Sequence, residues 1–408
     1  MTLATVAQTP IGVLRSPATI RERCRNVLDA AAGGRSPHFR IDRSRLDAAA
    51  ERVEAATRRR YPDLRIPYHS RWRHFKAGGV DRRSELDRAL QGRDAAGCAR
   101  ARIDLTVVSV LLDAGAGTEW AYVERESGDR FTRSEGLAVA SFRAFVAGAF
   151  SARRDDPLRA DAAALSRIDA AALARIFQVS GDNPLVGLEG RASLLRRLGV
   201  ALVAREEIFD DLARPGGLFE TLIPDDENAL TAVDLLHALQ DGLSSIWLSG
   251  NALDGVPLGD VWRHPYAGGD GRTAGWVPFH KLSQWLAYSL FEPFEWAGIG
   301  IVDPDALTAL PEYRNGGLLI DTGVLTLLDP RLNRQTFDVA SELVVEWRAL
   351  TVALIDELAP LVRGRLAFPE LPLACVLEGG TWGAGRDLAQ ELRDGAPPFA
   401  IRSDGTVF

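Results

Sequence analysis

The chain is poor in cysteine, in net positive charge and in long apolar runs. Three cysteines among 408 residues, Cys24, Cys98 and Cys375, are too few and too scattered for a disulfide scaffold, and they fit a reducing cytosol. The formal net charge of -7 argues against a protein that grips DNA or RNA. No apolar run approaches the roughly 20 residues of a bilayer span, and the first residues show no secretion signal. We therefore expect a cytoplasmic protein whose partners include no nucleic-acid polymer and no membrane.

Lysine is also scarce. Of 48 basic residues only Lys76 and Lys281 are lysine, and the rest are arginine. Such a bias usually reflects GC-rich coding, so a lysine that persists indicates a need for a compact ammonium rather than a planar guanidinium. Chance survival is the alternative. Both lysines fall in dense polar-aromatic stretches, which favours a functional interpretation.

Apolar residues recur at helical spacing through most of the sequence. The clearest helix is expected over 337–361, and others over 161–177, 185–205 and 231–247. The apolar run near 101–117 fits either a buried strand or a buried helix. The terminal FAIRSDGTVF is typical of a hairpin, and the glycine-rich 265–275 of a mobile loop, since it has no side chains to anchor it. The sequence predicts a mainly α protein: one compact helical domain over 1–408 with few short strands, in one lobe or in two lobes flanking a cleft.

The first polar stretch, IPYHSRWRHFKAGGVD, interleaves cations with aromatic rings. Arg71 or Arg73 could bind the phosphate of an anionic ligand through two hydrogen bonds, while an aromatic ring packs on the flat or sugar-like part of that ligand. His69 lies beside them in the sequence. The alternative is a surface segment whose arginines pair with neighbouring acids.

The second polar stretch, VPFHKLSQW, carries the other lysine. If a helix begins at Phe279, one of its faces carries Lys281, Trp285 and Tyr288, at positions i, i+4 and i+7. A lysine beside two aromatic rings and a glycine-rich loop is typical of a pocket wall. The alternative is an ordinary lysine whose stem lies along apolar surface.

The third polar stretch, ALPEYRNGGLLIDTG, places Glu312, Tyr313 and Arg314 between a proline and an Asn-Gly-Gly turn. We expect a loop here, ahead of a helix that begins near Leu318, and a carboxylate in that position is well placed for catalysis. Asp321 falls inside the helix and, if buried, needs a partner such as an arginine. The alternative for Glu312 is a surface ion pair with Arg314.

Motifs for metals and for activated nucleophiles are weak. The six histidines form no HExxH, no pair of them has a clear metal spacing, and no GxSxG is present, so we expect no metal and no cofactor. The segment EGGTWGAGR has the glycine density of a ligand-facing turn followed by a helix, and Arg386 could reach an anion there.

Five segments together resemble a known family: IPYHSRWRHFKAGG, DLTVVSVLLDAGAG, VPFHKLSQWLAYSL, LPEYRNGGLLIDTGVL and LEGGTWGAGR. They are similar to the family linked to the fungal and bacterial uracil-catabolism (URC) route, long catalogued as a domain of unknown function, over nearly the whole chain. The resemblance implies a role in a pathway that activates uracil to its nucleotide, opens the pyrimidine ring and ends in urea and a three-carbon acid. It leaves the step open.

The last third of the chain also resembles the queuosine-salvage N-glycosidases. Those enzymes hydrolyse the N-glycosidic bond of a nucleoside 5′-phosphate, so the resemblance implies a helical, DNA-glycosylase-like bundle. Lys281 matches a lysine of that family, and Glu346 and Arg348 match its Glu-x-Arg. Glu312 stands where the family carries the aspartate of an Asp-Tyr-Arg triplet, which keeps the charge but moves it by one methylene.

These features favour an N-ribosyl hydrolase acting on a small phosphorylated substrate such as ribosyl-urea phosphate. Cleavage of a C1′–N bond builds positive charge on the sugar, which a fixed carboxylate stabilises. Glu312 is the candidate for that role, with Asp321 in reserve, and His280 or His69 would protonate the departing nitrogen. The expected substrate-binding residues are Lys281, Arg314, Trp285, Tyr313, His69, Arg71, Arg73 and Arg348.

Two other functions remain open. An amidohydrolase would cleave the ureido or amide bond of a ring-opened pyrimidine, usually with a metal or an activated Ser or Cys, neither of which is clear in the sequence. A non-catalytic partner would bind a pathway nucleotide and regulate or channel another enzyme. Bound zinc would favour the first, and tight nucleotide binding without turnover the second.

Overall fold

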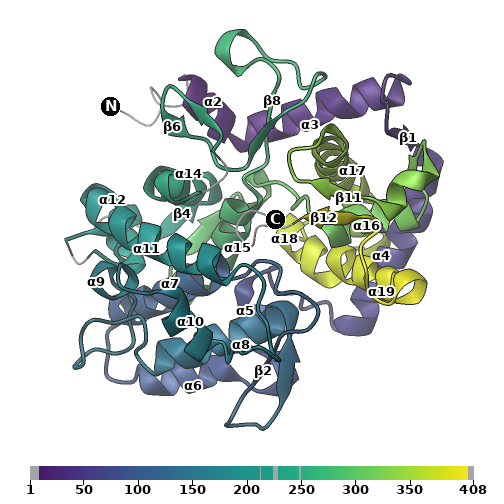
Figure 1. Cartoon of the computed structure of the whole chain (residues 1–408). Helices are drawn as coiled ribbons and strands as arrows, with labels where there is room; N and C mark the ends of the chain where they lie inside the picture. Colours follow the sequence, from purple (N-terminus) through teal and green to yellow (C-terminus); the bar gives the residue numbers. More distant parts are fainter. Residues whose placement is uncertain (1–8, 212, 224–227, 248–249, 403–408) are drawn as a thin grey trace. The chain divides into compact units, whose positions relative to one another are not determined.

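The computed structural model describes residues 9–211, 213–223, 228–247 and 250–402. The described chain is mainly helical with short two-stranded ladders, as the sequence predicts (Figure 1). Contacts divide it into two compact units: the first contains the chain up to His69 with Asn251–Gln284 and Asp303–Arg402, and the second contains Ser70–Gly250 and Trp285–Val302. Within the described residues, no helix is both long enough and apolar enough to cross a bilayer.

Helix α17, Glu342–Leu366, forms the centre of the first unit. It packs against α3 (Pro17–Ala32), α4 (Leu46–Arg60) and α16 (Tyr313–Asp321) (Figure 1). Its spaced apolar side chains are all buried, which confirms the helix predicted from their spacing: Leu343, Trp347, Leu350, Leu354 and Leu358. The helix begins five residues later than expected because the preceding residues form strand β11, Thr336–Asp338.

Short two-stranded ladders occur throughout the first unit, some between neighbouring segments and some between distant ones. The antiparallel pairs are β1 (Phe39–Ile41) with β10 (Leu325–Leu327), β5 (Ala252–Leu253) with β6 (Val256–Pro257), and β7 (Val261–Arg263) with β8 (Trp276–Pro278). Strand β12, Ala400–Arg402, lies parallel to β11. The strand of the expected C-terminal hairpin therefore pairs with a distant segment, and its expected turn, Asp404-Gly405, lies outside the described residues.

The segment between β7 and β8 is anchored, contrary to the prediction of a mobile loop. The Nδ2 of Asn26 donates a hydrogen bond to the carbonyl of Ala267, 2.9 Å away. A Cβ at Gly268 or Gly269 would collide with Asn26 or Arg23, so α3 packs directly on the backbone here. Side chains of helix α3 thus hold the glycine stretch of this segment in place.

The second unit is built mostly from helices. These are α5 (Arg71–His74), α6 (Arg82–Ala89), α7 (Ala95–Leu111), α8 (Arg133–Val146), α9 (Ala162–Leu165), α10 (Ala170–Ile176), α11 (Leu188–Ala204), α12 (Glu206–Phe209), α13 (Leu218–Leu222) and α14 (Ala232–Leu243). Strand β2 (Ala121–Val123) pairs with β3 (Arg130–Thr132), and β4 (Ala229–Thr231) with β9 (Gly300–Val302). The ambiguous apolar run is the buried helix α7. Asp169 caps α10 by accepting a hydrogen bond from the N–H of Ala172.

Helix α15, Lys281–Glu295, begins in the first unit and continues in the second. The C-terminal part of the first unit is a nearly continuous helix with three parts: α18 (Leu373–Val376), a π-helical turn (Leu377–Thr381) and α19 (Trp382–Arg393). The glycine-rich segment expected to form a turn is therefore helical. Its glycines allow close packing: a Cβ at Gly380 would overlap Val53 and Thr57 of α4, and α19 lies against α16.

Replacing Gly385 with alanine is expected to lower the free energy of unfolding by about 1–3 kcal/mol, the usual cost of overpacking. The added Cβ would lie far inside van der Waals contact of the Arg314 carbonyl oxygen, at the crossing of α16 and α19. Gly364→Ala on α17 is the matched control, because no atom lies within 4 Å of its added Cβ. That control should gain up to about 1 kcal/mol from helix propensity. Urea unfolding measures both, and equal stabilities would contradict the prediction.

Candidate functional site

Glu312 is the N-cap of helix α16 in the first unit. Its Oε2 accepts a hydrogen bond from the N–H of Arg314 at 2.7 Å, and its Oε1 accepts one from the N–H of Asn315 at 2.6 Å. The helix therefore begins at Tyr313, five residues before the expected start, because the carboxylate satisfies its first donors. The side chain is buried, with 9% of the residue exposed.

Burial is the main influence on the Glu312 carboxyl and raises its pKa above the ordinary value. The two backbone N–H groups, the ammonium of Lys281 and the ring of His69 act in the opposite direction and lower it. Lys281 is half-buried at the first position of α15. The structure thus brings Lys281 and His69 close enough to Glu312 to act on its charge, and all three belong to one unit.

His69 forms a carboxylate–imidazole pair with Glu378. The Nδ1 of His69 lies 2.8 Å from Oε2 of Glu378, and the Tyr61 hydroxyl donates to Oε1 of the same carboxylate at 3.0 Å. The ring of Trp382 lies 5.8 Å from that of His69. Glu378 stands on the π-helical turn, and such turns occur frequently at functional sites. This pair holds the imidazole in one orientation.

A buried ion pair connects the segments that carry Lys281 and Glu312. Arg348 of α17 donates from both terminal nitrogens to Asp260, each at 2.7 Å, and from Nε to the carbonyl of Pro311 at 3.2 Å. Asp260 also accepts from the backbone N–H of Lys281 at 3.0 Å. Although burial alone would raise the pKa of Asp260, the charge of Arg348 lowers it to about 2. Arg348, expected to bind substrate, here positions the start of α15 and the residue before Glu312.

His280 is buried and makes a hydrogen bond of its own to the backbone. Its Nε2 lies 2.9 Å from the carbonyl of Leu14, and burial lowers its pKa to about 4, so the ring is neutral at physiological pH. Its backbone φ is 47°, in the left-handed region, just before α15 begins. The structure therefore gives His280 a helix-starting position and a structural contact.

The other candidate residues of the first unit, Tyr313, Arg314 and Asp321, lie on α16, which packs against α19. Arg314 donates to the carbonyl of Gly395 at 3.2 Å and lies over the ring of Tyr313, 4.5 Å from its centre. Asp321 has the arginine partner that the sequence predicts, since Arg393 donates two hydrogen bonds to it at 2.8 and 2.7 Å. That carboxylate fastens the ends of the two helices.

Arg71, Arg73 and Trp285 belong to the second unit. Arg71 is fully buried: its Nε donates to the Ser109 hydroxyl at 2.7 Å, and its guanidinium lies 3.2 Å from Asp113. It also lies 5.8 Å from the centre of the Trp285 ring. Arg73 pairs with Glu292. Both arginines thus have acidic partners, as the alternative interpretation expected, but they are buried or nearly so. A role for them in substrate binding stays a prediction.

Sequence reasoning missed Glu378, Tyr61 and Asp260. Glu378 opens the segment EGGTWGAGR, whose glycines drew attention while its acid did not. Glu378 is the carboxylate partner of His69, but the two residues lie 309 positions apart, so no local sequence pattern links them. Among the described residues, the group that could hold a metal ion is His38, Glu342 and Glu346.

Comparisons with known proteins agree on one family. Residues 13–408 match the family described as "Protein of unknown function (DUF1688)". "Uracil catabolism protein 4" of Lachancea kluyveri is 39% identical over 435 residues, covering 98% of this chain and 99% of the relative. "Protein urg3" of Schizosaccharomyces pombe is 39% identical over 413 residues, with the same coverage. The chain therefore belongs to the DUF1688 family, as the resemblance to the uracil-catabolism family predicted.

Proposed function

We propose that this protein acts in uracil catabolism as an N-ribosyl hydrolase that cleaves a phosphorylated nucleoside-like intermediate such as ribosyl-urea phosphate. The observation that carries the proposal is the buried carboxylate of Glu312, fixed by two backbone N–H groups beside Lys281 and His69. The name of the L. kluyveri relative supports the pathway. The segments around Lys281 and Glu312 support the N-glycosidic reaction through their resemblance to the queuosine-salvage enzymes.

The reaction breaks the C1′–N bond, adds the hydroxyl of water to C1′ and returns a proton to the departing nitrogen. Positive charge grows on the sugar as the bond breaks, and the Glu312 carboxylate stabilises it electrostatically. Each of its oxygens has lone-pair capacity beyond the one backbone hydrogen bond that it accepts, which suffices to orient the attacking water.

His69 is the proton donor in this proposal. Glu378 lies on its Nδ1 and orients the ring, so the proton passes from Nε2. The ring of His280 is less suitable because its Nε2 already contacts the Leu14 carbonyl. Lys281 attracts the phosphate as a compact positive charge. We place the reaction in the cytoplasm, on a helical scaffold of the DNA-glycosylase type.

The direct test is to incubate the purified protein with ribosyl-urea phosphate and to quantify urea and ribose phosphate. Equimolar release of both supports the proposal. Release of ammonia or carbon dioxide without free urea would mean that the ureido bond is cleaved instead. Tight binding in calorimetry with no product would indicate a non-catalytic partner. Either of these last two results overturns the hydrolase assignment.

The acid limb of the pH–kcat profile is expected to have a midpoint above the ordinary glutamate pKa of 4.5, because burial raises the pKa of Glu312. The carboxylate must be ionised to stabilise the sugar cation, so turnover is lost as the pH falls through that value. Lys281→Met removes a charge that lowers the pKa and should move the midpoint to higher pH. Lys76→Met, at the other lysine, is the control and should leave it in place. An acid midpoint unmoved by Lys281→Met would contradict the prediction.

A further inference from the structure

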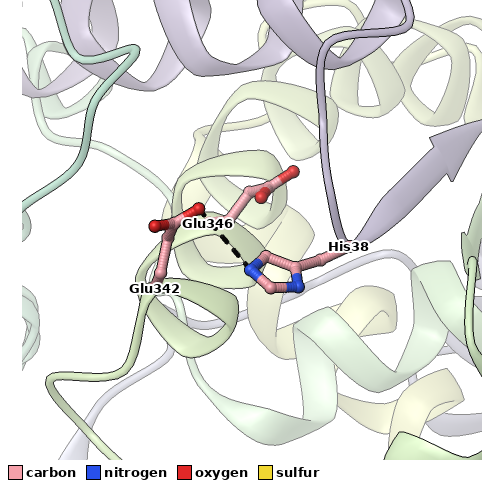
Figure 2. A group of neighbouring side chains, drawn as sticks. All are labelled: His38, Glu342 and Glu346. Atoms are coloured by element: carbon pink, nitrogen blue, oxygen red, sulfur yellow. Dashed lines mark ion pairs between the residues drawn. The ribbon is translucent and has the colours of Figure 1, made fainter.

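We infer that the first unit holds a divalent first-row transition-metal ion between His38, Glu342 and Glu346. One ligand atom from each of these side chains lies within 4.8 Å of the others. Figure 2 shows them converging, with the ion pair between His38 Nε2 and Glu342 Oε1 at 3.6 Å. The glutamates stand four residues apart in the first turns of α17, so both project from the same face of that helix. His38 comes from the residue before β1.

Glu346 is the buried member of this cluster, with only 1% of the residue exposed. Its Oε1 accepts a hydrogen bond from the Ser36 hydroxyl, but its Oε2 has no hydrogen-bond partner among the described residues. The Nε2 of His38 is also buried without a hydrogen bond there. A buried carboxylate oxygen left unsatisfied is costly, and a cation bound between these atoms would remove the cost.

Two further residues support the cluster without binding the ion. Ser36 Oγ accepts from the N–H groups of His38 and Phe39, at 3.1 and 2.7 Å, so one hydroxyl fixes both Glu346 and the backbone of His38. His264 accepts the N–H of Tyr266 on Nδ1 at 3.2 Å, which places its proton on Nε2. That Nε2 lies 3.7 Å from Oε2 of Glu346. Outer contacts of this kind orient the side chains that bind a metal.

The donor set indicates the class of ion. One imidazole with two carboxylates suits zinc or manganese, whereas calcium and magnesium prefer oxygen ligands alone. Metal–ligand bonds of about 2.0–2.2 Å place ligand atoms up to about 4.4 Å apart, so small side-chain movements close this site on an ion. The side chains of Glu342 and His38 are 46% and 23% exposed, which gives the ion a path from solvent. Histidine spacing in the sequence did not point to this site, because His38 and the two glutamates come from distant parts of the chain.

The test is calorimetric titration of chelator-treated protein with zinc chloride, with cobalt(II) absorption as a second readout. We expect one ion per chain, and at least about tenfold weaker binding for Glu342→Gln. Glu342 is half-exposed, so this variant should fold, and thermal melting without metal checks it. The matched control is Glu370→Gln, at an exposed glutamate outside the cluster, which should bind like the parent protein.

Ser36→Ala removes an outer contact and should also weaken zinc binding without changing the stoichiometry of one ion. The inference is overturned if the parent protein binds zinc no more tightly than Glu342→Gln, or if Glu370→Gln weakens binding equally. The readout is binding alone, so the result is independent of whether ribosyl-urea phosphate is hydrolysed.

Discussion

Glu312→Gln is expected to lower kcat for ribosyl-urea phosphate by about 10²- to 10³-fold while the protein stays folded. The substitution keeps the size of the side chain and removes the negative charge that faces the sugar cation. Removal of one preorganised electrostatic contact in a water-poor site typically costs this much in rate. The loss should appear in kcat more than in KM, because the charge on C1′ exists only in the transition state.

The N-cap role of Glu312 requires a stability control. A carboxylate accepts hydrogen bonds on two oxygens, here from Arg314 and Asn315, whereas glutamine has one acceptor oxygen. Loss of a cap costs about 1 kcal/mol, so kcat must be measured well below the melting temperature of the variant. Asp329→Asn is a matched control, because Asp329 caps a short helix of the same unit but is far more exposed. It should leave kcat unchanged. A folded Glu312→Gln protein with parental kcat would end the assignment.

Much of the helical framework was predictable because burial in this protein follows spacing, although the helix expected over 161–177 is divided into α9 and α10. The apolar positions of α17 and the cap at Asp169 needed only local rules. The start of α16 was not predictable in the same way: glutamate is an uncommon N-cap, and Asn-Gly-Gly is typical of a turn. The structure explains the first of these glycines by packing, since a Cβ at Gly316 would lie 2.6 Å from the Trp347 ring.

The site was predictable only in part. Resemblance pointed to Lys281 and Glu312, and the structure brings these two residues near each other. It could not identify Glu378 as the partner of His69 or Asp260 as the partner of Arg348, because these pairs join segments far apart in the sequence. Local pattern does not encode which charged residues meet after folding. Scarcity of lysine drew attention to Lys281, whose role in binding stays a prediction, whereas only the resemblance singled out Arg348 among the many arginines.

Asp260→Asn is expected to lower the free energy of unfolding by about 3–5 kcal/mol, because it removes one charge of a buried, hydrogen-bonded ion pair with Arg348. Both residues are buried, and the carboxylate accepts from four donors: two nitrogens of Arg348, the Trp262 ring N–H and the Lys281 N–H. Asparagine offers one acceptor oxygen and adds an NH₂ group that faces other donors. Guanidinium unfolding gives the measurement.

The control for Asp260→Asn is Asp338→Asn, which breaks the mostly exposed pair of Asp338 with Arg402 in the same unit. Exposed pairs contribute under about 1 kcal/mol, so the two variants separate the effect of burial from that of charge removal. The double variant Asp260→Asn with Arg348→Met should be less destabilised than Asp260→Asn alone, because it removes both charges of the pair. Equal stability of Asp260→Asn and Asp338→Asn would contradict the argument.

The pH dependence of stability provides an independent check of the same pair. The pKa of Asp260 is lowered to about 2 in the folded protein, from 3.8 when unpaired, so its contribution is complete above about pH 4 and is lost as the pH falls toward 2. Asp260→Asn should remove that part of the acid-induced loss. Because Asp260 holds the N–H of Lys281 while Arg348 holds the carbonyl of Pro311, the variant should also shift Lys281 relative to Glu312. A fall in kcat beyond that explained by unfolding is therefore expected, and it would identify the ion pair as a positioning device as well as a stabilising one.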